Sequence, residues 1–269
     1  MKNTYYLILL SLFVFACNNK TQPIDPTPKH DSFKIESKQV NETRVITVWT
    51  PPSYNNSDSS FPVLYMPDGG IKEDFPHIAN TIAKLVKEKS IPPIILVGIE
   101  NTNRRRDLSG ASTVKEDEEY CPLTDGATNF RNFITQELFI EINKKYRVTN
   151  KKGIIGESLA GLFVMETFLQ HPNYFDFYIA MDPSLWWNDH YLTKNANSLL
   201  KNRPNKNTKL WFAGSSAEDI SIHTNTLAKT LEVNTSRQLT WKYSDEPNEK
   251  HNTIFRATKE KALKWSLNN

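Results

Sequence analysis

Short apolar runs alternate with helical stripes along most of this 269-residue chain, and their order predicts its secondary structure. The chain opens on two segments of alternating polarity, Ser32–Gln39 and Thr43–Thr50, which predict two strands joined by a turn. Several later runs are continuously apolar, as expected of strands that are covered on both faces of a sheet. The further predicted strands are Phe61–Met66, Pro93–Ile99, Lys152–Gly156, Phe177–Met181, Lys209–Ala213 and Gln238–Tyr243.

Between these strands, apolar residues recur at helical spacing. One stripe is formed by Phe130, Phe133, Ile134, Leu138, Ile142 and Tyr146, and the other predicted helices are Asp74–Lys89, Leu159–Gln170, Tyr191–Leu200, Ile222–Val233 and Thr253–Leu267. Strands and helices therefore alternate after an opening antiparallel hairpin, which predicts a mostly parallel, doubly wound α/β sheet. Ligands of such sheets bind at the carboxyl ends of the strands.

The N-terminus has the pattern of an export signal. Lys2 precedes an apolar run from Tyr5 to Phe15, which is shorter than the roughly 20 residues that span a bilayer. The run leads into Val14–Cys17, which resembles the lipobox of a bacterial lipoprotein. We therefore expect residues 1–16 to be a signal peptide, residues 17–31 a flexible tether with a lipid on Cys17, and residues 32–269 one α/β domain.

This signal predicts export to the bacterial cell envelope, with the protein lipid-anchored and facing the periplasm or at the outer membrane. The alternatives are a plain signal peptide and an uncleaved anchor. The membrane is expected as a partner only through the lipid on Cys17. A lipidated Cys17 leaves Cys121 as a single thiol without an intramolecular disulfide, so stability would come from an ordinary core.

The net charge of the chain and its distribution indicate which classes of binding partner to expect. The formal net charge is +3, and Lys and Arg are spread along the chain apart from Arg104–Arg106. Nothing in this balance favours nucleic acid as a partner. The polar stretch Glu100–Gly126, which contains the three arginines, is long enough to suggest a function.

The stretch Ile154–Phe163, IIGESLAGLF, nearly matches the Gly-x-Ser-x-Gly turn of serine hydrolases. A predicted strand precedes Ser158 and a predicted helix follows it, which is the context that a nucleophile elbow requires. Gly156 supplies the small residue before the serine, and Ala160 adds one methyl group where the second glycine usually stands. The helix N-terminus would also offer amides and partial positive charge to an oxyanion. The alternative is that Ser158 only caps the helix.

A serine nucleophile needs a general base, because its hydroxyl is a weak nucleophile near neutral pH. In α/β hydrolases, whose folds open on an antiparallel hairpin as this chain does, the order along the chain is serine, acid, histidine. His251 lies between the last predicted strand and the last helix, where that base belongs. For the acid, Glu218 or Asp219 is slightly favoured over Asp182, which lies one strand too early for the usual order.

An oxyanion hole is expected from two backbone amides. One is the amide of Leu159, directly after Ser158. The other belongs to the glycine loop after the Phe61–Met66 strand, where Gly70 is the predicted donor. An ordinary glycine turn at this place is compatible with that role.

Four segments together resemble the putative esterase (esterase D-like) family of α/β hydrolases, in particular its siderophore-esterase branch. They are VLYMPDGG (Val63–Gly70), ENTNRRRDLSG (Glu100–Gly110), IIGESLAGLFVMETFLQHPNYFDFYIAMDPSLWWND (Ile154–Asp189) and the region around His251. The family includes siderophore, feruloyl and acetylxylan esterases and S-formylglutathione hydrolases. The resemblance implies that Ser158 is the nucleophile and His251 the catalytic histidine, with Gly70 and Leu159 as oxyanion amides. The branch also includes members with a Ser-His dyad, which need no dedicated acid.

Two further pairs of residues are candidates for substrate binding. Arg104 and Arg106 match an Arg-x-Arg-Asp segment of the family. They could bind an anionic acyl or phenolate group, or one of them could order the long loop by pairing with Asp107. Trp186 and Trp187 lie in a segment that resembles the SPSLWW stretch bordering the family's pocket. They could stack on an aromatic or sugar substrate, or belong to the core.

Together these residues predict a serine esterase. His251 deprotonates Ser158, which attacks an ester carbonyl, and water then releases the acid from the acyl-enzyme. The expected partner is a small-molecule ester, and no metal or cofactor is expected. The alternatives are an acyltransferase of the same fold and a non-catalytic binding lipoprotein on a hydrolase scaffold.

Overall fold

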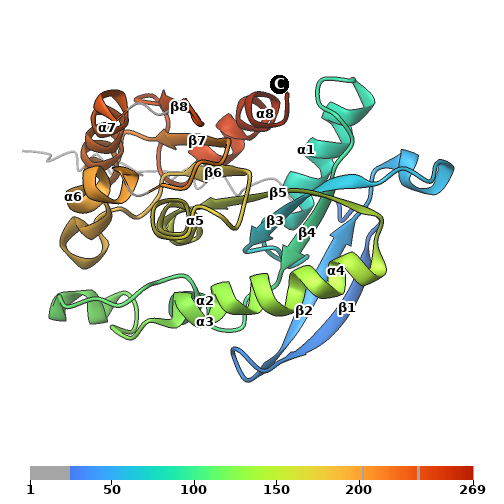
Figure 1. The fold of residues 1–269 in the computed structure, drawn as a ribbon, viewed down its shortest axis with the longest axis horizontal. Coiled ribbons are helices and arrows are strands. Elements are labelled where there is room, and N and C mark those ends of the chain that lie inside the picture. The colour runs from blue at the N-terminus through green and yellow to red at the C-terminus, as the bar shows by residue number, and fades with distance from the viewer. Residues whose placement is uncertain (1–24, 202, 235–236, 269) are drawn as a thin grey trace, which may run out of the picture.

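A computed structural model describes residues 25–201, 203–234 and 237–268 of the chain. Within these residues, eight strands form one sheet in the order β1-β2-β4-β3-β5-β6-β7-β8 (Figure 1). The β1–β2 and β2–β4 pairs are antiparallel, and all the other neighbours are parallel, which confirms the predicted sheet. The strands are β1 (Asp31–Ser37), β2 (Glu42–Trp49), β3 (Phe61–Pro67), β4 (Ile95–Ile99), β5 (Val148–Glu157), β6 (Phe177–Met181), β7 (Thr208–Gly214) and β8 (Leu239–Asp245).

Helices cover both faces of this sheet (Figure 1). One face is covered by α1 (Phe75–Lys87) and α8 (Ile254–Leu267). The other face is covered by α3 (Gly126–Asn132), the π-helical η3 (Phe133–Leu138), α4 (Phe139–Lys145), α5 (Leu159–Gln170), α6 (Trp187–Lys201) and α7 (Glu218–Val233). The segments α3, η3 and α4 follow one another directly and appear as one long helix in Figure 1. Three short segments lie in loops: η1 (Pro52–Asn56), α2 (Arg104–Asp107) and η2 (Lys115–Glu119).

The strand β6 illustrates why the sequence folds into a sheet with two covered faces. Successive side chains of a strand point to opposite faces. Phe177, Ile179 and Met181 accordingly pack in the core beneath α1 and α8, while Tyr178 and Ala180 pack in the other core. All five are almost completely buried, so a continuously apolar run supplies both cores at once.

One difference from the predicted elements, at the start of α7, affects the candidate site. This helix begins at Glu218, one turn earlier than the predicted start at Ile222. Glu218 and Asp219 therefore occupy its first turn, where the partial positive charge of the helix N-terminus favours carboxylates. Glu218 and Asp219 therefore lie in a helix and not in the loop after β7, where the sequence analysis had predicted them.

The first described residues contact the body of the domain. Arg256 of α8 donates a hydrogen bond to Asp25 at 2.6 Å, and Asn80 of α1 donates to the carbonyl of Pro26 at 2.8 Å. Cys121 is a buried free thiol. The predicted signal peptide and Cys17 lie outside the described residues. In the described ranges, no helix combines the length and the apolar character needed to cross a bilayer.

Candidate active site

Ser158 lies at a sharp turn between β5 and α5. Its φ of 59° and ψ of −119° fall in a region that residues other than glycine rarely adopt, at a cost of roughly 1–3 kcal/mol. Three backbone hydrogen bonds hold it there. The Ser158 amide donates to the carbonyl of Met181 at 3.0 Å, and the Ser158 carbonyl accepts from the amides of Leu162 and Ser184 at 2.9 and 3.1 Å. The turn is therefore tied both to α5 and to the end of β6.

The small residues around the serine are explained by the close approach of strand and helix. A Cβ atom added to Gly156 would lie 2.6 Å from the backbone of Ala160, so only glycine fits at this position. Ala160 itself is fully buried. Its methyl group occupies the space that the missing side chain of Gly156 leaves open, which explains why alanine is tolerated in place of the second glycine.

His251, in the loop between β8 and α8, connects Ser158 to Asp182. Its Nε2 lies 2.9 Å from Ser158 Oγ, and its Nδ1 lies 2.9 Å from Asp182 Oδ2. Asp182 is fully buried, and its other oxygen accepts a hydrogen bond from the Ser215 amide at 2.5 Å. The hydrogen bond with Asp182 raises the pKa of His251 above its ordinary value, although burial of the ring acts in the opposite direction.

The expectation that Glu218 or Asp219 would partner the histidine is wrong, because the described residues that hydrogen-bond to His251 are Ser158 and Asp182. The reason is the position of β6 between β5 and β7, which places its carboxyl end beside the serine turn. A signal was present in the sequence. Asp182 directly follows a continuously apolar strand, which indicates that its carboxylate is buried and therefore needs a hydrogen-bond partner.

The two predicted oxyanion amides have different surroundings. Leu159 is the first residue of α5, so its amide is one of those that have no carbonyl partner within the helix. The Gly70 amide instead donates to Glu73 Oε2 at 2.7 Å. The other oxygen of Glu73 accepts from the Asn101 amide at 3.3 Å, and burial raises the pKa of this carboxyl. In this arrangement Gly70 is engaged within its own loop, and its amide must leave Glu73 before it can bind an oxyanion.

Comparison with known proteins identifies the family of the chain. Residues 37–267 match the family model described as "Putative esterase". The chain belongs to this family. Its fold is the α/β-hydrolase fold, and the enzyme is a carboxylic ester hydrolase, as the sequence predicted.

Three proteins are similar to this chain. The chain is 30% identical to ferri-bacillibactin esterase BesA of Bacillus subtilis over 183 residues, which are 61% of each chain. It is 27% identical to the apo-salmochelin esterase of Escherichia coli O6:H1 over 158 residues, which are 54% of this chain and 49% of that protein. The match therefore spans about half to three fifths of these two relatives. The crystal structure of an IroE-like serine hydrolase from Shewanella oneidensis superposes with a TM-score of 0.79 at 25% identity, covering 88% of this chain and 79% of that one.

In this esterase, the two predicted substrate-binding arginines are held by acidic side chains. Arg104 donates two hydrogen bonds of 2.8 Å to the carboxylate of Asp68, which lies in the glycine loop. Arg106 binds Asp107 at 2.8 Å and Glu42 at 2.5 and 3.0 Å, and its hydrogen bonds lower the pKa of Glu42 to about 2. Arg106 thus has the loop-ordering contact with Asp107 that the sequence offered as an alternative. Arg104 joins the loop after β4 to the predicted oxyanion loop.

The two tryptophans also differ from each other. Trp187 is buried and donates its indole hydrogen to the Gly110 carbonyl at 3.1 Å, so it belongs to the core. Trp186 is partly exposed and meets Tyr120 edge to face, with 5.1 Å between ring centroids. Tyr120 itself is 54% exposed. Of the predicted pair, Trp186 is the one that presents an accessible aromatic surface, together with Tyr120.

A turn that the sequence analysis missed follows these tryptophans. Residues 188–190 have positive φ angles of 51°, 49° and 60°, which break the regular start of α6. The side-chain oxygen of Asn188 accepts from the Thr113 amide at 3.0 Å, and the Asn188 amide donates to Asp117 at 2.9 Å. The long polar loop is therefore fastened to the segment that carries the tryptophans.

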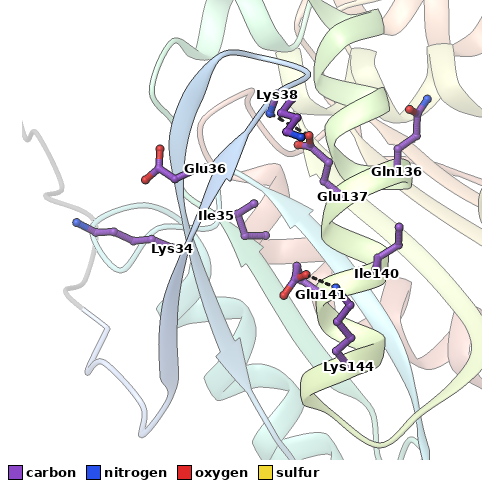
Figure 2. Close-up of a pocket in the computed structure, with 9 residues that line it drawn as sticks. All are labelled: Lys34, Ile35, Glu36, Lys38, Gln136, Glu137, Ile140, Glu141 and Lys144. Atoms are coloured by element: carbon purple, nitrogen blue, oxygen red, sulfur yellow. Dashed lines mark hydrogen bonds and ion pairs between the residues drawn. The ribbon is translucent and has the colours of Figure 1, made fainter.

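A surface groove of about 500 Å³ elsewhere on the domain contains none of these residues (Figure 2). It runs between β1 and the long helix of η3 and α4, and its walls are mainly lysine and glutamate side chains: Lys34, Ile35, Glu36, Lys38, Gln136, Glu137, Ile140, Glu141 and Lys144. It offers no nucleophile and no histidine. Among the described residues, no group of three or more His, Cys, Asp and Glu side chains is arranged to hold a metal ion.

Proposed function

We propose that the protein hydrolyses carboxylic esters through an acyl intermediate on Ser158. His251 accepts the hydroxyl proton at Nε2 as Ser158 Oγ attacks the ester carbonyl. Asp182 keeps the other ring nitrogen protonated and stabilises the imidazolium that forms. The imidazolium then protonates the leaving alkoxide. Water, deprotonated by the same ring, attacks the acyl-enzyme and releases the carboxylic acid and the free serine.

The observation that carries this proposal is the continuous hydrogen-bonded chain from Ser158 through His251 to Asp182, with 2.9 Å at each link to the imidazole. A serine that only capped α5 would accept a hydrogen bond from an amide in the first turn of that helix, and the Ser158 side chain makes no such bond. An intact chain of this kind also favours an enzyme over a binding protein on a retired scaffold.

The oxyanion of the tetrahedral intermediate is assigned to the amides of Leu159 and Gly70. The first residue of α5 lies where the helix N-terminus provides both an N–H group and partial positive charge. Gly70 joins it when its amide leaves the carboxylate of Glu73, to which it is bonded in the free enzyme.

For the substrate, we propose esters of the siderophore type that carry an aryl group. Two relatives are named for siderophore ester hydrolysis, which supports this class. The accessible aromatic surface of Trp186 and Tyr120 suits an aryl group, because aromatic pairs gain about 0.5–1.5 kcal/mol beyond the burial of area. A panel of siderophore, feruloyl, acetyl-sugar and simple alkyl esters tests the assignment. A clear preference for acetyl-sugar esters would contradict it.

The decisive experiment on the mechanism is Ser158→Ala, assayed with p-nitrophenyl butyrate. We expect turnover to fall by more than about 1,000-fold while the far-ultraviolet circular dichroism spectrum is unchanged. A fluorophosphonate probe should label the wild type and not this variant. Ser198→Ala, the same change on the exposed surface of α6, serves as the matched control. Retained turnover in Ser158→Ala would refute the mechanism, and product analysis with an added alcohol separates hydrolysis from acyl transfer.

We also propose, from the N-terminal sequence pattern, that the mature protein is attached to the bacterial cell envelope through a lipid on Cys17. Cys17→Ser should then move the protein from the membrane fraction to the soluble fraction. Unchanged membrane attachment of this variant would contradict the proposal.

A further inference from the structure

Glu157 is an acidic residue at the reaction centre that the mechanism above does not use. It is the last residue of β5 and directly precedes Ser158. Its Oε1 lies 3.7 Å from His251 Nε2, the same nitrogen that is bonded to Ser158 Oγ at 2.9 Å. The carboxylate is therefore within about 7 Å of the attacking oxygen.

The Glu157 carboxylate is partly buried, and it makes an ion-pair contact with His251. Its side chain is 18% exposed, and among the described residues it accepts no hydrogen bond. Burial raises its pKa to about 7, while the neighbouring His251 imidazole acts in the opposite direction. A carboxylate with this little exposure loses part of its hydration without gaining a hydrogen bond from the protein. Packing at the end of β5 therefore does not account for an acid at this position.

Four charged or titratable groups from the surrounding elements act on the ionisation of Glu157. They are His251 from the β8–α8 loop, Asp68 and Asp74 from the loop between β3 and α1, and Arg104 from the loop after β4. The positive charge of Arg104 is paired with Asp68 through two hydrogen bonds. Once Glu157 is ionised, we therefore expect a negative field where the reacting carbonyl binds.

We propose that Glu157 determines substrate specificity by charge: it favours esters with a cationic group near the scissile bond and disfavours esters with an anionic group there. This inference rests on the proposed ester hydrolysis. Two unit charges about 7 Å apart change a rate about threefold in water and about 50-fold at an effective dielectric constant of about 20. The partly buried site lies between these limits, so we expect about a tenfold effect for each unit of substrate charge.

The test uses three p-nitrophenyl esters of similar size: the trimethylammonio-butanoyl ester, its isostere with a tert-butyl group, and the glutaryl half-ester. At about pH 8, above the pKa of about 7, the wild-type kcat/KM should fall about tenfold at each step from cation to neutral to anion. Glu157→Gln keeps the shape and removes the charge, so the three values should converge to within about threefold. Glu141→Gln, the same change on α4, is the control and should keep the wild-type order.

A second measurement needs no variant. As the pH is lowered from about 8 to about 6, Glu157 gains a proton, and the wild-type preference for the cationic over the anionic ester should shrink. The ratio of the two kcat/KM values cancels the titration of His251, because both reactions need the same neutral base.

The outcomes separate this inference from the function on which it rests. If Glu157→Gln cleaves the neutral ester and keeps the wild-type charge order, the role of Glu157 is overturned and the proposed function stands. If the wild type cleaves none of the three esters, the proposed function fails. If Glu157→Gln does not fold, the pH series on the wild type decides, and a ratio that does not change with pH overturns the inference.

Discussion

The substitution Asp182→Asn removes one charge from the buried end of the hydrogen-bonded chain and keeps its shape. The asparagine oxygen can still accept from the Ser215 amide, which turns its NH₂ group toward His251 Nδ1. Nδ1 must then act as the acceptor, so the ring proton moves to Nε2. A protonated Nε2 cannot take the proton of Ser158, and the chain of proton transfer is interrupted at its first step.

The expected loss in kcat is about 10,000-fold, which is the size of effect that the wrong imidazole tautomer causes in serine hydrolase triads. This corresponds to about 5 kcal/mol of transition-state stabilisation. The effect on folding should be much smaller. The variant replaces charge-assisted hydrogen bonds of a fully buried group with neutral ones, at a cost of about 1–3 kcal/mol in the free energy of unfolding.

Steady-state hydrolysis of p-nitrophenyl butyrate measures the loss, and thermal unfolding followed by circular dichroism shows whether the variant is folded. Glu218→Gln and Asp219→Asn are the matched controls, since both remove a carboxylate charge from the first turn of α7. Each should keep kcat within about threefold of the wild type, as expected for surface changes. If Asp182→Asn retained more than a tenth of the wild-type kcat, the enzyme would operate as a Ser-His dyad and the reasoning above would be refuted.

Two further predictions concern the same site. The pKa of His251 is raised above its ordinary 6.5, so acidification through that higher value protonates the general base. The acid limb of kcat/KM should therefore lie above pH 6.5. A pH–rate profile whose acid limb lies at or below pH 6.5 would contradict this prediction. Glu73→Ala should release the Gly70 amide from a hydrogen bond to a charged acceptor, which is worth about 1.5–3 kcal/mol, and raise kcat by about 10- to 100-fold. A lower kcat at unchanged Tm would instead show that Gly70 is not an oxyanion donor.

The fold could be predicted from the sequence because its signals are local. A run such as Phe177–Met181 is apolar at every position, and the structure buries it on both faces of the sheet. The serine turn could also be predicted from local signals. Ten positions contain the end of a strand, the small residue Gly156, the serine and the start of a helix. Such features need no knowledge of which strands are neighbours.

The acid of the site could not be chosen from local signals alone, because the choice between candidates also depends on the order of the strands. Asp182 and Asp219 both follow a strand and both stand between Ser158 and His251 in the chain. The choice between them depends on whether β6 or β7 lies next to β5, and on where α7 begins. Neither property is encoded in a pattern of apolar spacing.

Contacts that depend on the tertiary structure or on loop conformation could not be predicted from the sequence either. Glu157 meets His251 across 94 positions of the chain, and the sequence shows only that an acid precedes the serine. The bond between Gly70 and Glu73 is close in sequence, but it depends on the conformation of a loop that follows no regular pattern. Asn188 and Asp189 are residues that tolerate positive φ, but their types alone do not show that residues 188–190 all adopt it in succession.

The backbone strain at Ser158 has a consequence for engineering. The φ angles of 59° at Ser158 and 44° at Asp182 are ones that glycine adopts more easily than serine or aspartate. Replacing Ser158 with glycine should relieve this strain and raise the stability of the fold, whereas turnover requires the serine, so the two properties favour different residues at this position. Directed evolution that selected only for survival at high temperature would discard the serine early, and a thermostable working enzyme requires selection on product formation in every round.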